Sequence, residues 1–292
     1  MAKLKVAFVT TIPTDAVPFI SAVNSVNERL GDVVEAKIQT GGDFRALGKL
    51  EDFIQFAQKS HVTLVHLMGD LPEFDLLVST LKSARVPLFV STSFFGQNAK
   101  FKGYSTVTAE DYKEIFKYLN YGGKKNIENL LLYLANRFAG ANYEIKPPER
   151  PPWEGIYHPE FAHSPTFEEY AAKKIAPGRP TVGIWFHQTQ WQGENTNFVN
   201  QLIAEIERQG ANVLPVFFTG AKNEALGMRG LEWVIENYFM KNGKPVVDVV
   251  ISALAFSLST SLFGATAVEV LKKLGVPIIK AILTCNTCDE WR

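Results

Sequence analysis

The chain has 292 residues, with 46% hydrophobic and 21% charged side chains, the composition of a globular protein of about two domains. Basic and acidic residues number 30 each, so the charge gives no sign of a nucleic-acid or acidic membrane partner. No apolar run reaches the ~18 residues of a membrane helix. The N-terminal MAKLKVAFVT has too short an apolar run for a signal peptide, so we expect a cytoplasmic protein.

The first half of the chain alternates between short apolar runs and amphipathic segments. Buried strands are expected over 4–10, 33–38, 61–67 and 87–90, and helices over 15–30, 50–58, 74–83, 109–120 and 125–138. Gly122 and Gly123 mark the break between the last two helices. Such alternation predicts a parallel sheet with helices on both faces. Residues 1–140 are therefore interpreted as a doubly wound α/β domain of the flavodoxin or Rossmann type.

Residues 141–178 differ in composition, because prolines and aromatic residues are interleaved there. The residues concerned are Pro147, Pro148, Pro151, Pro152, Pro159 and Pro165 with Trp153, Tyr157, Phe161 and Phe167. The prolines forbid regular structure through much of the stretch, while the aromatic residues argue against a disordered linker. We expect an ordered strap that joins two domains and packs against both, with a short helix over 167–173.

A second alternation of strands and helices follows the strap. Strands are expected over 180–186, 212–217, 246–252 and 277–283, and helices over 195–209, 230–240 and 266–274. Residues 179–292 are therefore predicted to form a second doubly wound parallel-sheet domain. Because no element follows the last strand to cover the sheet, we expect this domain to be truncated and the chain to be the head of a longer polypeptide.

The stretch from Arg179 to Val199 contains the candidate site. An apolar strand, Thr181 to Phe186, is followed by a polar loop over 187–192, and Asn195-Thr196 then signals the start of a helix. In open α/β sheets ligands bind in the crevice at the carboxyl ends of strands. The alternative is a loop that is only solvated, as many such loops are.

The sequence lacks the common nucleotide and hydrolase motifs: it contains no GxxxxGK[ST], GxGxxG, GxSxG or HExxH. Its two cysteines, Cys285 and Cys288, form a CxxC pair that is a redox motif, half a metal site or, as the simplest interpretation, two reduced thiols. Structural roles are expected for the strand-flanking His61 and His66, and packing or surface roles for the strap histidines His158 and His163, although the last two are spaced closely enough to share a ligand. No metal site is predicted.

Several stretches resemble the large, tetrapyrrole-binding subunits of cobaltochelatases and magnesium chelatases, the CobN, BchH and ChlH type. The most specific runs from Pro180 to Phe217, PTVGIWFHQTQWQGENTNFVNQLIAEIERQGANVLPVF. VDVVISALAFSL, LKKLGVPIIKAI and DEWR follow in the order found in that family. In the first half, LVHLMGDLPEF, YLNYGGKKNIENLLLYLANRF and IYHPEF are similar to the cobaltochelatase side of the family. The resemblance thus covers nearly the whole chain.

The resemblance implies insertion of Co²⁺ or Mg²⁺ into a corrin or porphyrin precursor, driven by ATP hydrolysed on separate AAA+ partner subunits. Mg-ATP is then expected on these partners and no cofactor on this chain. The family subunits are far longer, so the match corresponds to their N-terminal head and the catalytic residues are expected beyond Arg292. The first half of the sequence is more similar to the cobaltochelatases, which favours cobalt but does not decide between the two metals. Where the family often has Tyr-Arg after the strand, this chain has His187-Gln188, which weakens the case for a bidentate carboxylate clamp.

Five residues are expected to contact the tetrapyrrole at the carboxyl end of the 181–186 strand: His187, Gln190, Trp191, Asn195 and Thr196. Trp191 would cover the face of the ring, while Asn195 and Thr196 would donate to its edge. His187 would make affinity vary between about pH 5.5 and 7.5, around the ordinary histidine pKa of ~6.5. Alternatively, Trp191 packs the two domains together and Asn195 only caps a helix.

Two functions of other classes remain open on the sequence. One is a stand-alone two-domain small-molecule-binding protein without catalysis. The other is a structural head that docks partner subunits.

Overall fold

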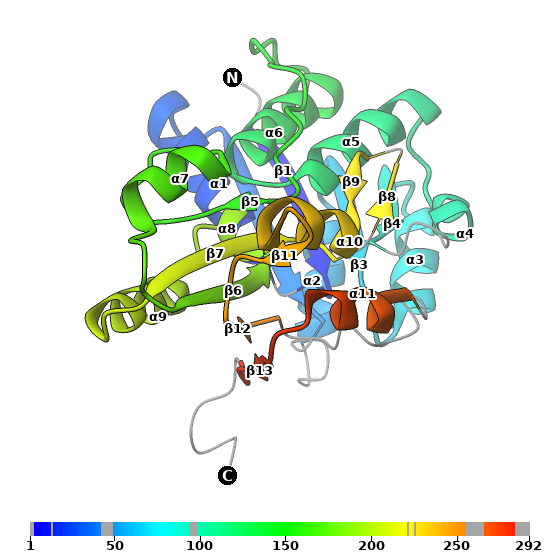
Figure 1. Cartoon of the computed structure of the whole chain (residues 1–292). Helices are drawn as coiled ribbons and strands as arrows, with labels where there is room; N and C mark the ends of the chain where they lie inside the picture. Colours follow the sequence, from blue (N-terminus) through cyan, green and yellow to red (C-terminus); the bar gives the residue numbers. More distant parts are fainter. Residues whose placement is uncertain are drawn as a thin grey trace. The chain divides into compact units, whose positions relative to one another are not determined.

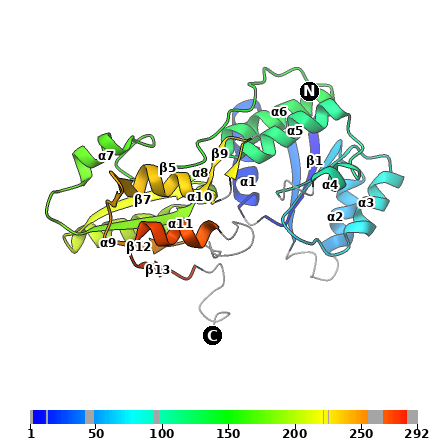
Figure 2. The same cartoon turned by 45° about the vertical axis from the view of Figure 1, so that its right-hand side comes forward.

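The computed structural model describes residues 3–12, 14–41, 49–93, 98–220, 222–224, 226–254 and 266–283. The chain splits into two compact units, residues 1–151 and 152–292 (Figures 1 and 2). Both contain helices and parallel strands, which confirms the expected α/β class. No helix in these described ranges is long and apolar enough to cross a membrane. Cys285, Cys288 and the DEWR segment lie outside the described residues.

The first unit contains a sheet of four parallel strands in the order β2-β1-β3-β4. The strands are β1 (Leu4–Thr10), β2 (Val34–Thr40), β3 (Val62–Leu67) and β4 (Leu88–Thr92). Their apolar runs lie where the sequence predicts, although β2 and β4 each extend two residues further than expected. Thr10, His66 and Ser91 share one register position across β1, β3 and β4, near the carboxyl edge of the sheet.

Helices pack on both faces of this sheet. They are α1 (Ala16–Leu30), α2 (Lys49–Ala57), α3 (Phe74–Ser83), α4 (Asn98–Lys102), α5 (Ala109–Tyr121) and α6 (Lys124–Ala139). Because side chains alternate along a strand, Val6 and Phe8 of β1 join the core with α1, α5 and α6, whereas Ala7 and Val9 join the core with α2 and α3. Gly122, with φ of 59°, ends α5 immediately before α6, which confirms the expected helix boundary.

The first part of the expected strap, residues 141–151, belongs to the first unit and has no regular secondary structure. Asparagine side chains of α6 hydrogen-bond to its backbone. The pairs are Asn136 with Tyr143, Asn129 with Lys146 and Asn126 with Glu149, at 2.7–2.9 Å. The partners recur at every third residue, which is the period of a polyproline II helix. Side-chain amides therefore replace the backbone partners that a helix or sheet would supply.

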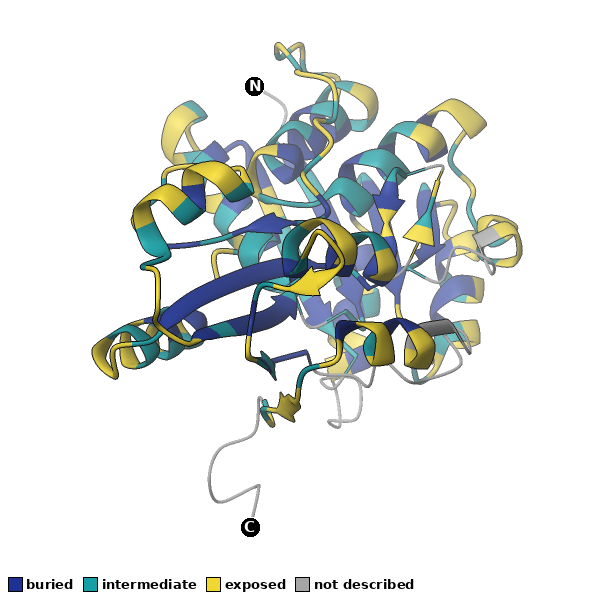
Figure 3. Cartoon of the chain, in the orientation of Figure 1, coloured by how far each residue is buried: buried dark blue, intermediate teal, exposed yellow. Residues whose placement is uncertain are grey.

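The second unit contains a sheet of five strands in the order β13-β12-β6-β7-β5. The strands are β5 (Gly155–Ile156), β6 (Thr181–His187), β7 (Asn212–Phe218), β12 (Val249–Ser252) and β13 (Ile278–Lys280). Four are parallel, but β5 pairs antiparallel with β7. The expectation of a wholly parallel second sheet is therefore wrong at this edge, because the strap supplies a strand to the open side of β7. In Figure 3 the central strands β6 and β7 are largely buried.

Short helices and hairpins complete the second unit. The helices are α7 (Phe167–Lys174), α8 (Gln188–Gln192), α9 (Asn197–Arg208), α10 (Gly230–Val234) and α11 (Thr266–Leu274), and the hairpins pair β8 (Lys222–Asn223) with β9 (Met228–Arg229) and β10 (Met240–Lys241) with β11 (Lys244–Pro245). A single helix was expected over 230–240. The chain instead passes from α10 into a π-helical turn, η3 (Ile235–Phe239).

Phe239, at the end of η3, explains the glycine in the middle of β6. A Cβ on Gly183 would lie 2.8 Å from the Phe239 ring, a separation that real side chains do not reach. Phe239 in turn meets the ring of Trp185 edge to face, with centroids 5.5 Å apart. Gly183 therefore lets the ring approach the strand and close the core on one face of the sheet.

The remainder of the strap, residues 152–178, is held by burial in the second unit. Tyr170 of α7 is fully buried and its hydroxyl donates to the Val213 carbonyl of β7 at 2.7 Å. The Thr166 hydroxyl accepts the Glu169 N–H, and the Glu169 carboxylate accepts the Thr166 N–H, which caps α7 at its first turn. The expected short helix is confirmed, whereas packing of the strap against both units stays a prediction.

Candidate functional site

The polar residues after β6 form a helix rather than the expected loop. His187 ends β6 and caps α8: its Nδ1 accepts the Thr189 N–H at 3.3 Å and lies 2.7 Å from the Thr189 hydroxyl. The Gln190 side-chain oxygen accepts the His187 N–H at 3.3 Å, which closes the capping box. These reciprocal bonds satisfy backbone donors that a loop would leave to water. They also fix two of the five predicted contact residues, His187 and Gln190, against each other.

His187 does not change charge near neutral pH in the ligand-free chain. Burial lowers the pKa of its imidazole to about 4, and a hydrogen bond with the Thr219 backbone acts weakly in the opposite direction. The imidazole is therefore neutral throughout the range of pH 5.5 to 7.5. The lowered pKa argues against a change of charge around pH 6.5 in the free chain, whereas the expected variation of ligand affinity with pH stays a prediction. The burial that lowers the pKa is a property of the folded unit and cannot be inferred from the local sequence.

Trp191 has one face covered inside the second unit. Its ring stacks on Phe217 of β7, with centroids 4.3 Å apart and planes 6° from parallel. Phe217 is fully buried, whereas Trp191 is only partly buried. The contact supports a packing role for Trp191 within the second unit, while the alternative that Trp191 packs the two domains together stays untested. The partly exposed indole remains large enough to offer aromatic surface to a ligand.

Asn195 is not a helix cap. Helix α9 begins at Asn197, its cap position is Thr196, and the Thr196 side chain makes no capping bond. The exposed Asn195 donates its backbone N–H to the Gln190 carbonyl at 2.8 Å, which is the turn between α8 and α9. The expected capping role is therefore wrong, since the chain makes an extra turn before α9 starts.

Thr196 faces the strap. Its hydroxyl lies 3.0 Å from that of Tyr157, and the Tyr157 hydroxyl donates to the Asn200 side-chain oxygen at 2.8 Å. Because a phenol has a single hydrogen, Thr196 is the donor to Tyr157. The Tyr157 ring also packs edge-on against Phe186, with centroids 5.8 Å apart.

Tyr157 and Asn200 are thus part of the candidate site, although neither was predicted. Tyr157 lies in the IYHPEF stretch and reaches the site from 39 residues away, a distance that no local pattern reveals. Together the residues bring aromatic surface, hydroxyls and amides to the carboxyl ends of β6 and β7. Such a set can hold an apolar ring with polar groups at its edge.

A second group of polar residues lies where the strap meets α9. His158, Glu160 and Glu207 offer ligand atoms within 4.8 Å of one another, a geometry that could hold a metal ion. The Lys174 ammonium is already bonded to both carboxylates, at 2.6 Å to Glu160 and 3.2 Å to Glu207. The two carboxylates that a metal would need are therefore already paired with a cation. We interpret the group as an ion-pair cluster that fastens the strap to α9.

His158 is neutral in this cluster. Burial and the neighbouring Lys174 lower its pKa, against a hydrogen bond with Glu207. Its Nδ1 accepts the Glu160 N–H at 3.2 Å, so Nε2 donates to the Glu207 carboxylate at 3.3 Å. His163, five residues on, is exposed. The two strap histidines therefore do not share an environment.

The histidines of the first unit have the structural roles expected. His61 Nδ1 accepts the Lys5 N–H at 2.9 Å. His66 Nδ1 lies 2.9 Å from the Asp15 carboxylate, which also accepts the Thr10 hydroxyl at 3.0 Å. Among the described residues, the buried His66 Nε2 and Ser91 Oγ make no hydrogen bond.

The chain matches the family described as CobN/Magnesium Chelatase over residues 116–292, more than half its length. It is also 31% identical over 300 residues to an uncharacterized protein of Methanocaldococcus jannaschii, covering 99% of this chain and 24% of that protein. The chain therefore belongs to the CobN/magnesium chelatase family.

Two further comparisons agree with this family. The aerobic cobaltochelatase subunit CobN of Pseudomonas aeruginosa is 30% identical over 126 residues, covering 43% of this chain and 10% of that subunit. The catalytic subunit of cobaltochelatase from Mycobacterium tuberculosis has a similar fold, with a TM-score of 0.57, 19% identity and coverage of 98% of this chain and 22% of that chain. The chain thus spans about a quarter or less of the length of these relatives.

Proposed function

We propose that this chain acts as the head of a chelatase large subunit and contributes to binding the tetrapyrrole into which a metal is inserted. The observation that carries the proposal is membership of the CobN/magnesium chelatase family. Within the family both cobalt and magnesium enzymes occur, and we favour Co²⁺ as the metal substrate because the first half of the sequence resembles the cobaltochelatase side.

The candidate site supports a binding role rather than a catalytic one. A tetrapyrrole is a wide apolar disc edged with carboxylates or amides. Trp191, stacked on Phe217, offers an aromatic face, and the exposed Asn195 amide lies a few residues along the chain from it. His187, neutral near pH 7, retains a hydrogen-bonding nitrogen rather than a positive charge. Proton transfer by His187 at neutral pH is not part of the proposal.

The energy source is assigned to other subunits. The sequence contains no phosphate loop, so we propose that Mg-ATP is hydrolysed by AAA+ partner subunits and that the reaction is of the ligase class, in the cytoplasm. Addition of purified partner ATPases with ATP should then leave nucleotide bound to the partners and not to this chain, as measured by labelled-nucleotide binding to each separated component.

Binding is tested with the full chain and a porphyrin or a corrin, by quenching of tryptophan fluorescence. Asn195→Ala should weaken binding about tenfold, the loss of one hydrogen bond to ligand, while the melting temperature stays unchanged because this side chain is exposed and caps nothing. Asn197→Ala is the matched control: it removes an equally exposed amide two residues away, at the first position of α9, and should leave affinity unchanged.

The outcomes separate the parts of the proposal. Equal affinity of wild type and Asn195→Ala would remove Asn195 from the site. An absence of binding to either ring would remove the tetrapyrrole role of this chain and favour a head that docks partners. Tighter binding of the corrin than of the porphyrin would support cobalt over magnesium.

A further inference from the structure

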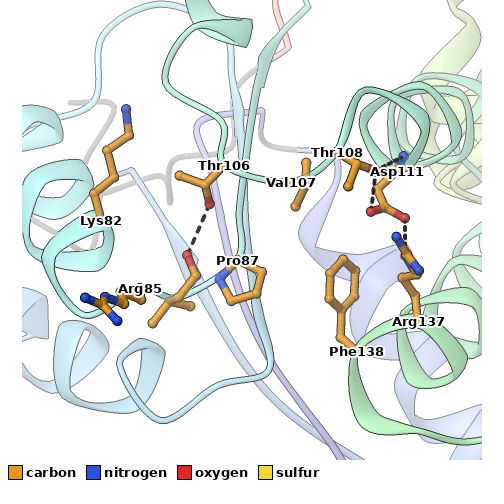
Figure 4. A pocket seen from close by; sticks show the side chains of 10 residues that line it. Lys82, Arg85, Pro87, Thr106, Val107, Thr108, Asp111, Arg137 and Phe138 are labelled. Carbon is orange, nitrogen blue, oxygen red and sulfur yellow. Dashed lines mark hydrogen bonds and ion pairs between the residues drawn. The ribbon is translucent and has the colours of Figure 1, made fainter.

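The first unit contains a cavity of about 440 Å³ whose lining includes no residue of the candidate site. It opens between the C-terminal end of α3, the start of β4, residues 106–108 and the C-terminal end of α6 (Figure 4). Its lining is apolar in the middle and cationic on two sides. The lining residues are Lys82, Arg85, Val86, Pro87, Thr106, Val107, Thr108, Asp111, Arg137 and Phe138.

A buried carboxylate orients Arg137 on one side of this cavity. Asp111 is only 2% exposed, and its Oδ1 accepts from Arg137 Nε at 2.8 Å and from the Tyr133 hydroxyl at 2.8 Å. The Thr108 hydroxyl donates to Oδ2 at 2.6 Å. Burial alone would raise the pKa of Asp111, but the hydrogen bonds from Thr108, Arg137 and Tyr133 offset burial and lower it. Asp111 is therefore ionised and fixed.

The terminal nitrogens of Arg137 remain available. Only Nε is bonded to Asp111, and no bond joins the two Nη atoms to another part of the described chain. The side chain is about half exposed. A guanidinium held through Nε presents its Nη atoms as a paired donor, the geometry that recognises a carboxylate or phosphate.

Lys82 and Arg85 lie across the cavity from Arg137 (Figure 4). Both are exposed, and the Arg85 guanidinium forms no ion pair with any described residue. Arg85 has φ of 57°, a left-handed conformation that is uncommon for a residue other than glycine. Between the two cationic sides lie Pro87 and Phe138. The one carboxylate in the lining is already paired with Arg137, so the cavity carries an excess of positive charge.

We propose that this cavity binds a small organic dianion whose apolar middle lies over Pro87 and Phe138 and whose two acidic groups reach Arg137 at one end and Arg85 with Lys82 at the other. Because both ends of the cavity are cationic, an elongated dianion can pair with both of them at once, whereas a small inorganic anion can pair with only one. The cavity should therefore prefer the dianion. The proposal goes beyond tetrapyrrole binding and does not depend on it, since the cavity belongs to the first unit.

A different explanation of the same cations makes a different prediction. Lys82 lies in the last turn of α3 and Arg85 follows the helix by two residues, where positive side chains complement the helix dipole. On this explanation Arg137 serves only to neutralise Asp111. On that explanation, anions are attracted weakly and without preference for shape, and removing any nearby positive charge has the same small effect.

The experiment titrates the full chain with succinate, glutarate and adipate by calorimetry, at low salt and again near 0.15 M ionic strength. Butyrate and 1,4-butanediol are the monoanionic and neutral controls. We expect the best dicarboxylate to bind at least about tenfold more tightly than butyrate, and Arg137→Gln and Arg85→Gln each to weaken it about tenfold or more. Lys113→Gln removes an exposed charge of α5 that does not line the cavity and should change affinity less than about twofold.

Arg85→Gln keeps the test decisive even if Arg137→Gln unfolds the first unit, because the exposed Arg85 side chain supports no buried group. Equal affinity for butyrate and the dicarboxylates would overturn the proposal. So would equal losses in Arg85→Gln and Lys113→Gln, which would reduce the site to general charge attraction.

Discussion

The two parts of the strap are ordered by different forces. Residues 141–151 in the first unit are held through their backbone, by the side-chain amides of Asn126, Asn129 and Asn136. Residues 152–178 in the second unit are held through their side chains and by the strand β5, with Tyr170 fully buried in the core. One proline-rich stretch can therefore be fixed without regular structure in one part and by ordinary core packing in the other.

The difference shows which groups matter in each part. Where α6 binds the backbone of the strap, the hydrogen bonds depend on the asparagines of α6, and the strap side chains contribute only the partial burial of Ala141, Tyr143 and Ile145. Where side chains are buried, stability depends on the strap residues themselves, because apolar area removed from water scales with their size. Perturbations of the two parts should therefore have effects of different size, and three experiments test this.

The largest effect is expected from Tyr170→Ala. It removes a fully buried ring and leaves the Val213 carbonyl without its 2.7 Å donor, so the free energy of unfolding of the second unit should fall by about 3–5 kcal/mol. Urea unfolding followed by hydrogen exchange at β7 measures this. Tyr143→Ala, in the other part, removes a partly buried ring and keeps the backbone bonds to Asn136, so it should cost clearly less. Equal losses would contradict the comparison.

Asn126→Ala should have an intermediate effect. Asn126 is buried and bonds to the Glu149 N–H and carbonyl and to the Gly122 carbonyl, so its loss should cost roughly 1–3 kcal/mol and release the strap locally. Faster amide exchange at Glu149, with exchange at β5 unchanged, would check this. Glu149→Ala is the matched control, because it keeps the backbone atoms that Asn126 binds. If the Glu149 amide exchanged at the same rate in Asn126→Ala as in Glu149→Ala, the Asn126 side chain would not be what holds the strap.

The smallest effect is expected from mild acid. His158 has a folded-state pKa lowered by burial and by Lys174, while an unfolded histidine has a pKa of ~6.5. Below pH 6.5 the unfolded chain takes up a proton that the folded chain does not, so the stability of the second unit should fall as pH decreases toward the folded pKa. A series of unfolding curves from pH 7 to 5 should show a shallower decline in His158→Gln. Identical slopes would remove His158 as a contributor.

The sequence predicted the strands well where continuous apolar runs specify them. Strand β1 has the bounds expected, and β7 begins where expected and ends one residue later. The side chains of both strands are largely buried on both faces, which is what a continuous apolar run indicates. Strand β5 could not be predicted, since two residues carry no period and become a strand only beside β7. Helix α8 was missed because its cap is a histidine, a residue that rarely has this role.

Only those residues of the candidate site that are close together in the sequence were predicted. His187, Gln190 and Trp191 were recognised because they follow a buried strand. Phe217, which stacks on Trp191, and Tyr157, which pairs with Thr196, come from other parts of the chain, and neither spacing nor composition indicates that these residues meet. The degree of burial that lowers the pKa of His187 is likewise a property of the folded unit and not of its neighbours in sequence.

The asparagine-held part of the strap has a consequence for how this region can vary over evolution. Backbone N–H and carbonyl groups are the same for every residue except proline, so the hydrogen bonds at residues 143, 146 and 149 survive any substitution that does not introduce proline. The exposed Lys146 and Glu149 can therefore change freely, whereas the Tyr143 ring also packs against the core. The prolines of this part, at positions 147, 148 and 151, avoid all three. Substitutions should therefore accumulate faster at Lys146 and Glu149 than at their asparagine partners on α6, although the strap is the part that looks distinctive in the sequence.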